Sequence, residues 1–375
     1  MTIKSGLNLI ICFICVLIIS ACSLYQKPVT GASPVVKVLL YQGESIFIKP
    51  SGNYILSYNS RKEEGNGRIS VEISGEEIFL NGVEIKTPIV EVYTEDGFAF
   101  DGKKYSGSAL IAVSNRSILL INSIDIESYL KGVLPVEVPY GWEIEALKSQ
   151  AVVSRTFAIY EVESSRKKGR IFDIYNDTRS QTYYGREKET KETSLAVDST
   201  HGEVLKYDGK IIQAFYHASS GGMTESSLEV FGFYEPYFTP VESPYSSIYK
   251  EDKWTATIPL DKAGLLLRIT NRIISVIVTE RTSSKRIKTA EFTDEAGLKK
   301  PIPGKELREL IGPALMKSTR ANVRITNDNL FLSGMGYGHG VGMGQWDALG
   351  MSRHGYSYKY ILTYFYRGAE VEKIW

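Results

Sequence analysis

The sequence has few cysteines and few histidines. All three cysteines, Cys12, Cys15 and Cys22, lie in the first 22 residues, so the rest of the chain has neither a disulfide nor thiol chemistry. The four histidines, which run from His201 to His354, lack the short spacing that paired metal ligands have. We therefore predict that the protein uses no metal and no cofactor.

The chain also lacks an excess of charge of either sign. It has 44 Lys and Arg against 43 Asp and Glu, and Lys4 is the only charged residue in the first 21. Removal of that segment would leave 43 of each sign. Because nucleic-acid binding depends on a basic surface that neutralises phosphates, the charge balance argues against a nucleic-acid partner.

A long hydrophobic run is missing as well. The apolar run from Leu7 to Ile19 is too short for a comfortable membrane span and is typical of the central part of a signal peptide. It leads directly into Ser20-Ala21-Cys22, the pattern of a lipobox, in which the cysteine becomes the lipidated N-terminus. We therefore predict a lipoprotein signal peptide over 1–21 and a tether over 22–34. The alternative is an uncleaved anchor helix.

Residues 35–124 read as short strands. Five segments are β-branched and aromatic with Gly, Asn or Asp between them: Val35–Tyr41, Glu44–Ile48, Tyr54–Tyr58, Arg68–Ile73 and Ile118–Ile121. Asn81-Gly82 and Asp101-Gly102 are two-residue hairpin signals. We find no catalytic group here and interpret this part as a β-rich scaffold.

A helix without Gly or Pro is predicted from Glu143 to Ser165. Its apolar residues recur on more than one face, so we expect it to be enclosed on most sides. Gln150 and Arg155 would then lie among apolar residues, where an unpaired amide or guanidinium is costly. Each is therefore expected to have a fixed partner and to support the site.

Glu137 precedes this helix in the segment Pro135-Val-Glu-Val-Pro139. The two prolines bias Leu134 and Val138 toward extended conformations, and apolar neighbours should raise the pKa of the carboxyl, as a general acid requires. The alternative is a solvated loop residue. Among nearby carboxylates, Glu127 is expected on the surface beside a short helix, and Glu143 and Glu145 in the first turn of the long helix.

Further elements follow the long helix. We predict a helix over 190–200, a hairpin of strands 203–207 and 210–216 around Asp208-Gly209, a strand over 273–278 and a helix over 304–312. From Gly334 to Gly344 glycine occupies every second position; if extended, one face would be bare backbone, open to a ligand or to close packing on the long helix. Two short helices ending at Gly355 and Gly368 close the chain.

Three motifs stand out: Glu137-Val-Pro with Trp142 and Glu145-Ala-Leu-Lys-Ser-Gln-Ala-Val-Val-Ser-Arg-Thr-Phe-Ala158, then His217-Ala-Ser-Ser-Gly-Gly-Met-Thr-Glu225, and Gly336-Tyr-Gly-His-Gly-Val-Gly-Met-Gly-Gln-Trp346. They resemble the motifs of the stage II sporulation protein D family, also called the SpoIID/LytB domain. The resemblance spans roughly residues 35–375. Some relatives carry Cys and His zinc ligands where this chain has Asp177-Thr-Arg-Ser-Gln181, so no zinc site is carried over.

The resemblance implies a peptidoglycan lytic transglycosylase. Such enzymes cut between N-acetylmuramic acid and N-acetylglucosamine without water and leave 1,6-anhydro ends, with Glu137 as the single catalytic carboxyl. Substrate-binding residues would be His217, Ser219, Ser220, Gly221, Thr224, His339 and Gln345. A non-catalytic glycan-binding module or an enhancer of a cell-wall amidase is the alternative, and a Ser/His hydrolase is a weaker one because no nucleophile elbow is present.

The sequence as a whole predicts an α+β fold. We expect a β-rich lobe over 35–124 and a mixed, catalytic lobe over 125–375 that is built around the long buried helix, with a groove between segments. The expected partners are glycan strands, the membrane through lipid on Cys22, and other cell-wall hydrolases. The expected location is outside the cytoplasm, anchored to the membrane and facing the cell wall.

Overall fold

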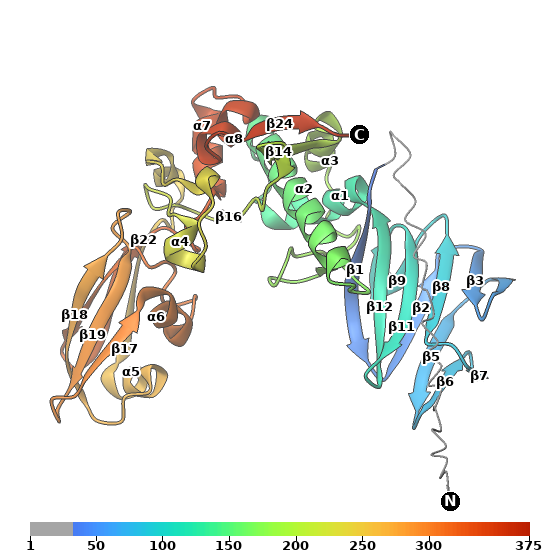
Figure 1. The fold of residues 1–375 in the computed structure, drawn as a ribbon, viewed down its shortest axis with the longest axis horizontal. Helices are drawn as coiled ribbons and strands as arrows, with labels where there is room; N and C mark the ends of the chain where they lie inside the picture. The colour runs from blue at the N-terminus through green and yellow to red at the C-terminus, as the bar shows by residue number, and fades with distance from the viewer. Residues whose placement is uncertain (1–32) are drawn as a thin grey trace, which may run out of the picture. The chain divides into compact units, whose positions relative to one another are not determined.

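Helices and several β-sheets occur together in the computed structural model, which describes residues 33–375 (Figure 1). This confirms the predicted α+β class. The predicted signal peptide, Cys22 and all but the end of the predicted tether lie outside the described residues. Within residues 33–375, no helix is both long enough and apolar enough to cross a membrane.

Two sheets account for the first part of the chain. The seven-stranded sheet has the order β13-β1-β12-β11-β8-β3-β4, and the six-stranded sheet has the order β10-β9-β2-β5-β6-β7. Along β2 (Ser45–Pro50), Ile46 and Ile48 are buried whereas Phe47 and Lys49 are exposed, the period of two expected of a half-buried strand. The other strands are β1 (Val35–Gly43), β3 (Tyr54–Tyr58), β4 (Arg61–Gly65), β5 (Ile69–Ser74), β6 (Glu77–Leu80), β7 (Val83–Ile85), β8 (Ile89–Thr94), β9 (Phe98–Phe100), β10 (Lys103–Tyr105), β11 (Ser108–Ser114), β12 (Ser117–Asp125) and β13 (Ile174–Tyr175). The five predicted strands are confirmed.

The predicted two-residue turns are confirmed too. Asn81 and Gly82 have φ of 50° and 79°, and Asp101 and Gly102 have φ of 47° and 72°. Two successive residues with positive φ are the mark of a type I′ turn, whose twist matches that of the flanking strands.

Two helices follow β12. The first, α1 (Ile126–Glu137), is capped by Asp125, whose carboxylate accepts a hydrogen bond from the Ser128 backbone at 3.0 Å. It contains both Leu134 and Pro135, so the prediction that Leu134 is extended is wrong. A proline in the last turn removes one backbone hydrogen bond, and the helix ends two residues later. Val138 is extended before Pro139, as predicted. The second helix, α2 (Ile144–Lys167), is buried along most of its length, which confirms the predicted long helix.

The segment after α2 differs in part from the prediction. Helix α3 (Lys191–Ser199) and the hairpin of β14 (Glu203–Tyr207) and β15 (Lys210–Ile211) are confirmed, but the second strand ends five residues early. The chain then leaves this sheet, whose third strand is β24 (Glu370–Lys373). Tyr216 and His217 instead form β16, which pairs in parallel with β23 (Met343–Gly344).

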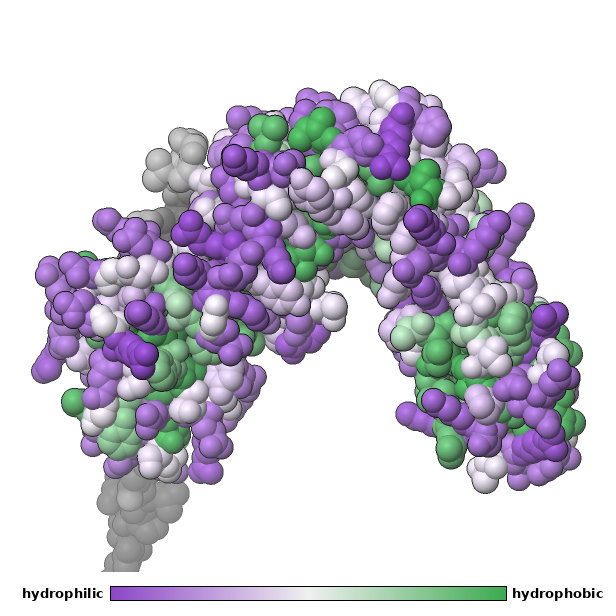
Figure 2. Space-filling model, turned by 180° about the vertical axis from the view of Figure 1, so that it is seen from behind, coloured by the Kyte–Doolittle hydropathy of each residue, from purple (hydrophilic) through white to green (hydrophobic). Residues whose placement is uncertain are grey.

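Residues 253–335 have a hydrophobic core of their own, which includes Trp254, Leu267, Phe292 and Leu332. They form two three-stranded sheets and two helices, which confirms the predicted strand near 273 and the predicted helix near 304. Figure 2 shows hydrophobic residues exposed among hydrophilic ones on the molecular surface. Within residues 253–335, Leu265 and Ile277 are exposed hydrophobic residues. The elements are β17 (Lys253–Pro259), α5 (Leu260–Leu267), β18 (Ile273–Arg281), β19 (Ile287–Asp294), β20 (Lys299–Pro303), α6 (Gly304–Ile311), β21 (Ala321–Thr326) and β22 (Asn329–Met335); the short helix α4 (Ser227–Phe231) and two 3-10 turns, Pro236–Phe238 and Pro244–Ile248, precede them.

The alternating glycines do not form an extended strand. Gly336, Gly338, Gly340 and Gly342 all have positive φ, so the chain winds between β22 and β23. A Cβ at Gly342 would lie 2.0 Å from the Phe215 carbonyl oxygen. The glycines therefore allow close packing, but on residues 215–221 and Arg286 rather than on α2. The predicted final helices are confirmed as α7 (Gln345–Arg353) and α8 (Tyr358–Phe365).

Candidate functional site

Glu137 is the last residue of α1 and is partly buried. The Gln345 side chain, at the first position of α7, donates a hydrogen bond from Nε2 to the Glu137 backbone carbonyl at 3.1 Å. The three motifs identified in the sequence therefore meet in part: Glu137 from the first lies against Tyr216, next to the second, and against Gln345 from the third.

Two effects oppose each other at the Glu137 carboxyl. Burial raises its pKa, because the charged form loses hydration. Hydrogen bonds from the Tyr216 hydroxyl, the Thr182 backbone and the Gln345 side chain act in the opposite direction, but the balance leaves the pKa above its ordinary value. A carboxyl with a raised pKa and several donors around it is suited to give and take a proton.

The sequence interpretation missed the residues that hold Tyr216. The Gln181 amide donates from Nε2 to the Tyr216 hydroxyl at 3.3 Å and to the Ser154 carbonyl at 3.4 Å, and its Oε1 accepts from the Tyr129 hydroxyl at 3.2 Å. Gln181 ends the segment Asp177–Gln181, for which the sequence indicated only that Cys and His ligands are absent, so nothing local pointed to its amide as a partner of Tyr216. Among the described residues, no group of three or more His, Cys, Asp or Glu side chains could hold a metal ion.

The two residues on α2 that were predicted to support the site, Gln150 and Arg155, are both buried. Arg155 has the expected fixed partner, since its guanidinium binds Glu127 through Nη2 at 2.7 Å and Nε at 3.0 Å. The expectation that Glu127 is a surface residue is therefore wrong: burial of Arg155 requires a buried counter-charge. Gln150 donates from Nε2 to the Ser154 hydroxyl at 3.1 Å, whereas its Oε1 is buried without a partner in the described part of the chain.

His217 and His339 form a second cluster, with ring centroids 5.5 Å apart. Successive residues of a strand point to opposite sides, so Tyr216 contacts Glu137 while His217 faces Val341, Arg286 and His339. Burial lowers the pKa of both imidazoles, that of His339 to about 4, so both are neutral at physiological pH. The structure pairs the two histidines but gives neither a contact with Glu137.

The predicted hydroxyl residues hydrogen-bond to interior groups. Ser219 donates to Asp252, and the Ser220 hydroxyl and backbone donate to Asp347 at 2.8 and 2.9 Å. The Thr224 hydroxyl accepts from the Val241 backbone at 2.8 Å. Gly221, with φ of 69°, packs against the Met335 backbone. These contacts hold the turn together, and a role of these four residues in substrate binding stays a prediction.

A small pocket of about 190 Å³ lies beside the Glu137 segment. Pro135 and Val138, on either side of Glu137 in the chain, line it together with Trp142 and the exposed Tyr140. Glu137 itself does not line it. The predicted groove at the Glu137 carboxyl therefore stays a prediction.

Comparison with known proteins identifies the family of this chain. Residues 114–207, which hold α1, Glu137 and α2, match the SpoIID model, described as stage II sporulation protein. The chain is 33% identical over 295 residues to an uncharacterized protein of Brachyspira hyodysenteriae, with 78% of each covered. It is 30% identical over 376 residues to the amidase enhancer of Bacillus subtilis, and the match covers 87% of this chain and 50% of that protein. It is 29% identical over 270 residues to stage II sporulation protein D of Bacillus subtilis, and this match covers 68% of this chain and 76% of that protein. The chain belongs to the stage II sporulation protein D family, with its SpoIID/LytB domain.

Proposed function

We propose that this protein is a lytic transglycosylase that cleaves peptidoglycan glycan strands between N-acetylmuramic acid and N-acetylglucosamine and leaves 1,6-anhydro ends. Membership of the SpoIID/LytB family supports a function connected with the cell wall. The observation that carries the proposal is the partly buried Glu137 carboxyl, whose pKa burial raises and the neighbouring Tyr216, Thr182 and Gln345 lower in part, while Gln345 binds its backbone carbonyl.

The proposed reaction needs one carboxyl in two roles. Protonated Glu137 gives its proton to the glycosidic oxygen as the bond from that oxygen to C1 of the muramoyl sugar breaks. The resulting carboxylate then takes the proton of the 6-hydroxyl as the oxygen of that group bonds to C1. Glu137 ends the cycle protonated, no water is consumed, and the second carboxylate of ordinary glycosidases is not required.

Neighbouring groups suit this cycle. The donors from Tyr216, Thr182 and Gln345 stabilise the carboxylate that forms midway, whereas burial favours the protonated form at the start. A helix end fixes the backbone of Glu137, and the Gln345 amide binds its carbonyl. In this proposal Tyr216 and Gln345 are positioning residues for Glu137.

A second candidate is a non-catalytic module that binds glycan strands or enhances a cell-wall amidase. One relative bears the name amidase enhancer, and this chain covers half of its length. In this reading the Glu137 cluster would bind sugar hydroxyls without proton transfer.

The proposal also includes export and attachment to the membrane through lipid on Cys22, so that the protein reaches its glycan substrate.

The test is mass spectrometry of the fragments that the purified protein releases from intact peptidoglycan and from peptidoglycan stripped of its stem peptides. Transglycosylation is expected to give fragments that end in 1,6-anhydro-N-acetylmuramic acid, 18 Da lighter than the hydrolysed ones. Binding to both substrates with no cleavage of either would instead favour the non-catalytic module.

A further inference from the structure

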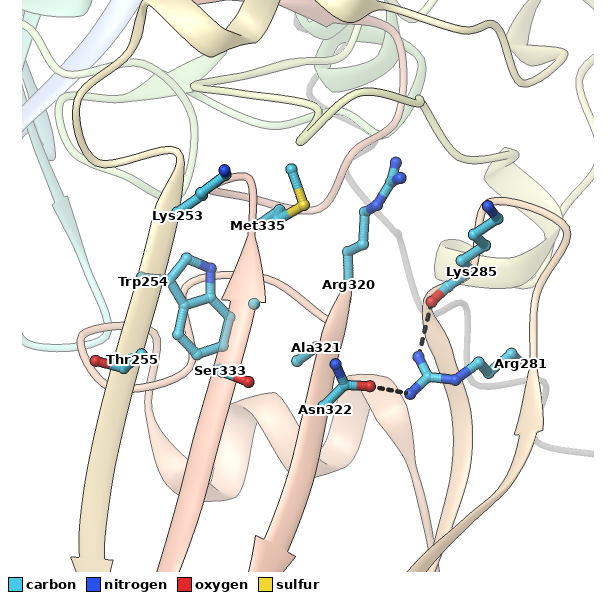
Figure 3. Close-up of a pocket in the computed structure, with 11 residues that line it drawn as sticks. Lys253, Trp254, Thr255, Arg281, Lys285, Arg320, Ala321, Asn322, Ser333 and Met335 are labelled. Atoms are coloured by element: carbon cyan, nitrogen blue, oxygen red, sulfur yellow. Dashed lines mark hydrogen bonds between the residues drawn. The ribbon is translucent and has the colours of Figure 1, made fainter.

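A second pocket, of about 640 Å³, lies in the region 253–335 and has no assigned role. The ends of β17, β22 and β21 form its floor, and the turn between β18 and β19 forms one side (Figure 3). None of its lining residues contacts Glu137, so it is not part of the cluster described above.

The charge of this pocket is of one sign. Lys253, Arg281, Lys285 and Arg320 line it, whereas no Asp or Glu does. Within residues 33–375, none of these four cations forms an ion pair. Figure 3 shows the side chains of Lys253 and Arg320 extending beyond the ends of their strands toward the same side. A chain whose charges otherwise nearly cancel thus concentrates four positive charges here.

Several contacts give the pocket a defined form. Arg281 donates to the Asn322 side chain and to the Lys285 carbonyl, both at 2.8 Å, and so links two strands with the turn. The Trp254 ring lies over Gly334, where a Cβ would come within 2.3 Å of the indole, and its Nε1 donates to the Gly336 carbonyl at 3.0 Å.

Arg320 connects this pocket to the second family motif. Its Nη1 is buried without a hydrogen-bond partner in the described part of the chain, and lies 3.7 Å from where a Cβ of Gly222 would be. A buried guanidinium nitrogen that lacks a partner is costly. The carboxylate that acts on Arg320 from within the protein, that of Asp252, already accepts from Ser219.

We infer that this pocket binds the free muramic-acid carboxylates of a glycan strand whose stem peptides have been removed. The inference rests on the proposed function, which places the protein on such a strand. Lys253 and Arg281 lie on β17 and β18, Arg320 immediately precedes β21, and Lys285 lies in the turn between β18 and β19. The four charges are therefore spread over the pocket, which suits charges spaced along an extended polymer. Asn322, Ser333 and Thr255 add neutral groups that can hydrogen-bond to sugar hydroxyls between the charges.

The test measures binding rather than cleavage. Soluble glycan strands without stem peptides, whose muramic acids carry free carboxylates, are titrated at low ionic strength into protein with Glu137→Gln. Lys253→Gln with Lys285→Gln should weaken this binding roughly tenfold, since two charges that face the ligand are lost. The matched control, Lys262→Gln with Lys305→Gln, removes two exposed lysines of the same region outside the pocket and should leave the affinity unchanged.

Chemical modification of the ligand separates charge from shape. Strands whose carboxylates are converted to methyl amides should bind the unmodified pocket as weakly as the free strands bind the Lys253→Gln, Lys285→Gln protein. The inference would be overturned if the free strands bound the Lys253→Gln, Lys285→Gln protein as tightly as the Lys262→Gln, Lys305→Gln protein. Undiminished binding of the amidated strands would overturn it too. Dependence on Lys253 and Lys285 for polyphosphate alone would also overturn it, in favour of a phosphate polymer. Because every protein in this test is inactive at Glu137, failure of the proposed catalysis would leave these binding results interpretable.

Discussion

At the scale of single residues, the pKa of the Glu137 carboxyl is set by burial and by the polar groups around it, which act in opposite directions. Burial raises the pKa of its carboxyl, whereas the Tyr216 hydroxyl, the Thr182 backbone and the Gln345 side chain lower it. A proton donor that must later become a base needs both influences. A glutamine at this position keeps the volume and most of the hydrogen bonding but has no transferable proton.

We therefore expect Glu137→Gln to fold normally and to form 1,6-anhydro ends about 100- to 10,000-fold more slowly, the usual range for loss of a general acid or base. Mass spectrometry of released fragments measures the rate, and circular dichroism checks the fold. Glu145→Gln is the control: Tyr358 and Lys148 outweigh burial and lower the Glu145 pKa, so it is not a proton donor near neutral pH. An unchanged rate in Glu137→Gln would show that the mechanism is wrong.

A second carboxyl, Asp347, should make stability depend on pH. Burial raises its pKa to about 6, although Ser243 and Ser220 donate hydrogen bonds to it. The folded state then binds a proton more tightly than the unfolded state, in which the pKa is about 4. Stability is greatest below pH 4 for this group and falls as pH rises toward 6, by roughly 3 kcal/mol in all.

Asp347→Asn should therefore flatten the change of thermal unfolding temperature between pH 4 and 6. Asp208→Asn removes an exposed carboxylate in a turn that tolerates asparagine, and should leave the profile as in the original protein. Profiles of the same slope in all three proteins would rule out Asp347 as the source of the pH dependence.

Some residue-level features could be predicted and others could not. The pattern of α2 indicated that Arg155 is buried and must be paired, because a helix that is apolar on several faces has no exposed side. It could not indicate Glu127, since the pairing joins positions 28 apart and depends on how α1 packs on α2. Tyr216 was missed for a similar reason: its partners Glu137 and Gln181 come together only through the tertiary fold.

At the scale of elements, local signals predicted most helices and hairpins, and the failures occurred where tertiary contacts decide. The type I′ turns follow from two residues that tolerate positive φ. The alternating glycines suggested an extended strand with a bare face, yet the same lack of side chains allows the tight winding that the structure shows. Periodicity of two cannot distinguish these cases when every second residue is glycine.

The contact between α1 and α2 carries a prediction of its own. Glu127 accepts hydrogen bonds from Arg155, from the Gly202 backbone at 3.1 Å and from Trp375 Nε1 at 3.2 Å, so it joins both helices to the end of the chain. Glu127→Gln would leave the buried Arg155 charge uncompensated and should lower the free energy of unfolding by about 3–5 kcal/mol.

Urea unfolding measures this loss, and Glu192→Gln, an exposed glutamate of α3, is the control that should change stability by less than about 0.5 kcal/mol. Glu127→Leu combined with Arg155→Met removes both charges and should be more stable than Glu127→Gln alone. A Glu127→Gln protein as stable as the original would mean that the ion pair does not tie α1 to α2.

At the scale of the whole molecule, the described residues contain the candidate site and the basic pocket, whereas the proposed attachment to the membrane depends on residues outside them. Export and lipid attachment would confine the protein to the surface where glycan strands lie. Lipid on Cys22 is the proposed anchor, and two or more acyl chains on one residue suffice for stable membrane attachment. The lipobox pattern Ser20-Ala21-Cys22 is the observation behind this prediction.

Cys22→Ala should abolish incorporation of labelled fatty acid and shift the protein from the membrane fraction to the soluble fraction. Cys15→Ala is the matched control, because Cys15 lies within the apolar run and not at the end of the lipobox, so labelling and fractionation should be retained. The mass of the mature protein gives an independent reading, since cleavage before Cys22 removes 21 residues. If Cys22→Ala stays in the membrane fraction with its N-terminus intact, the apolar run itself is the anchor, and the lipoprotein interpretation is wrong.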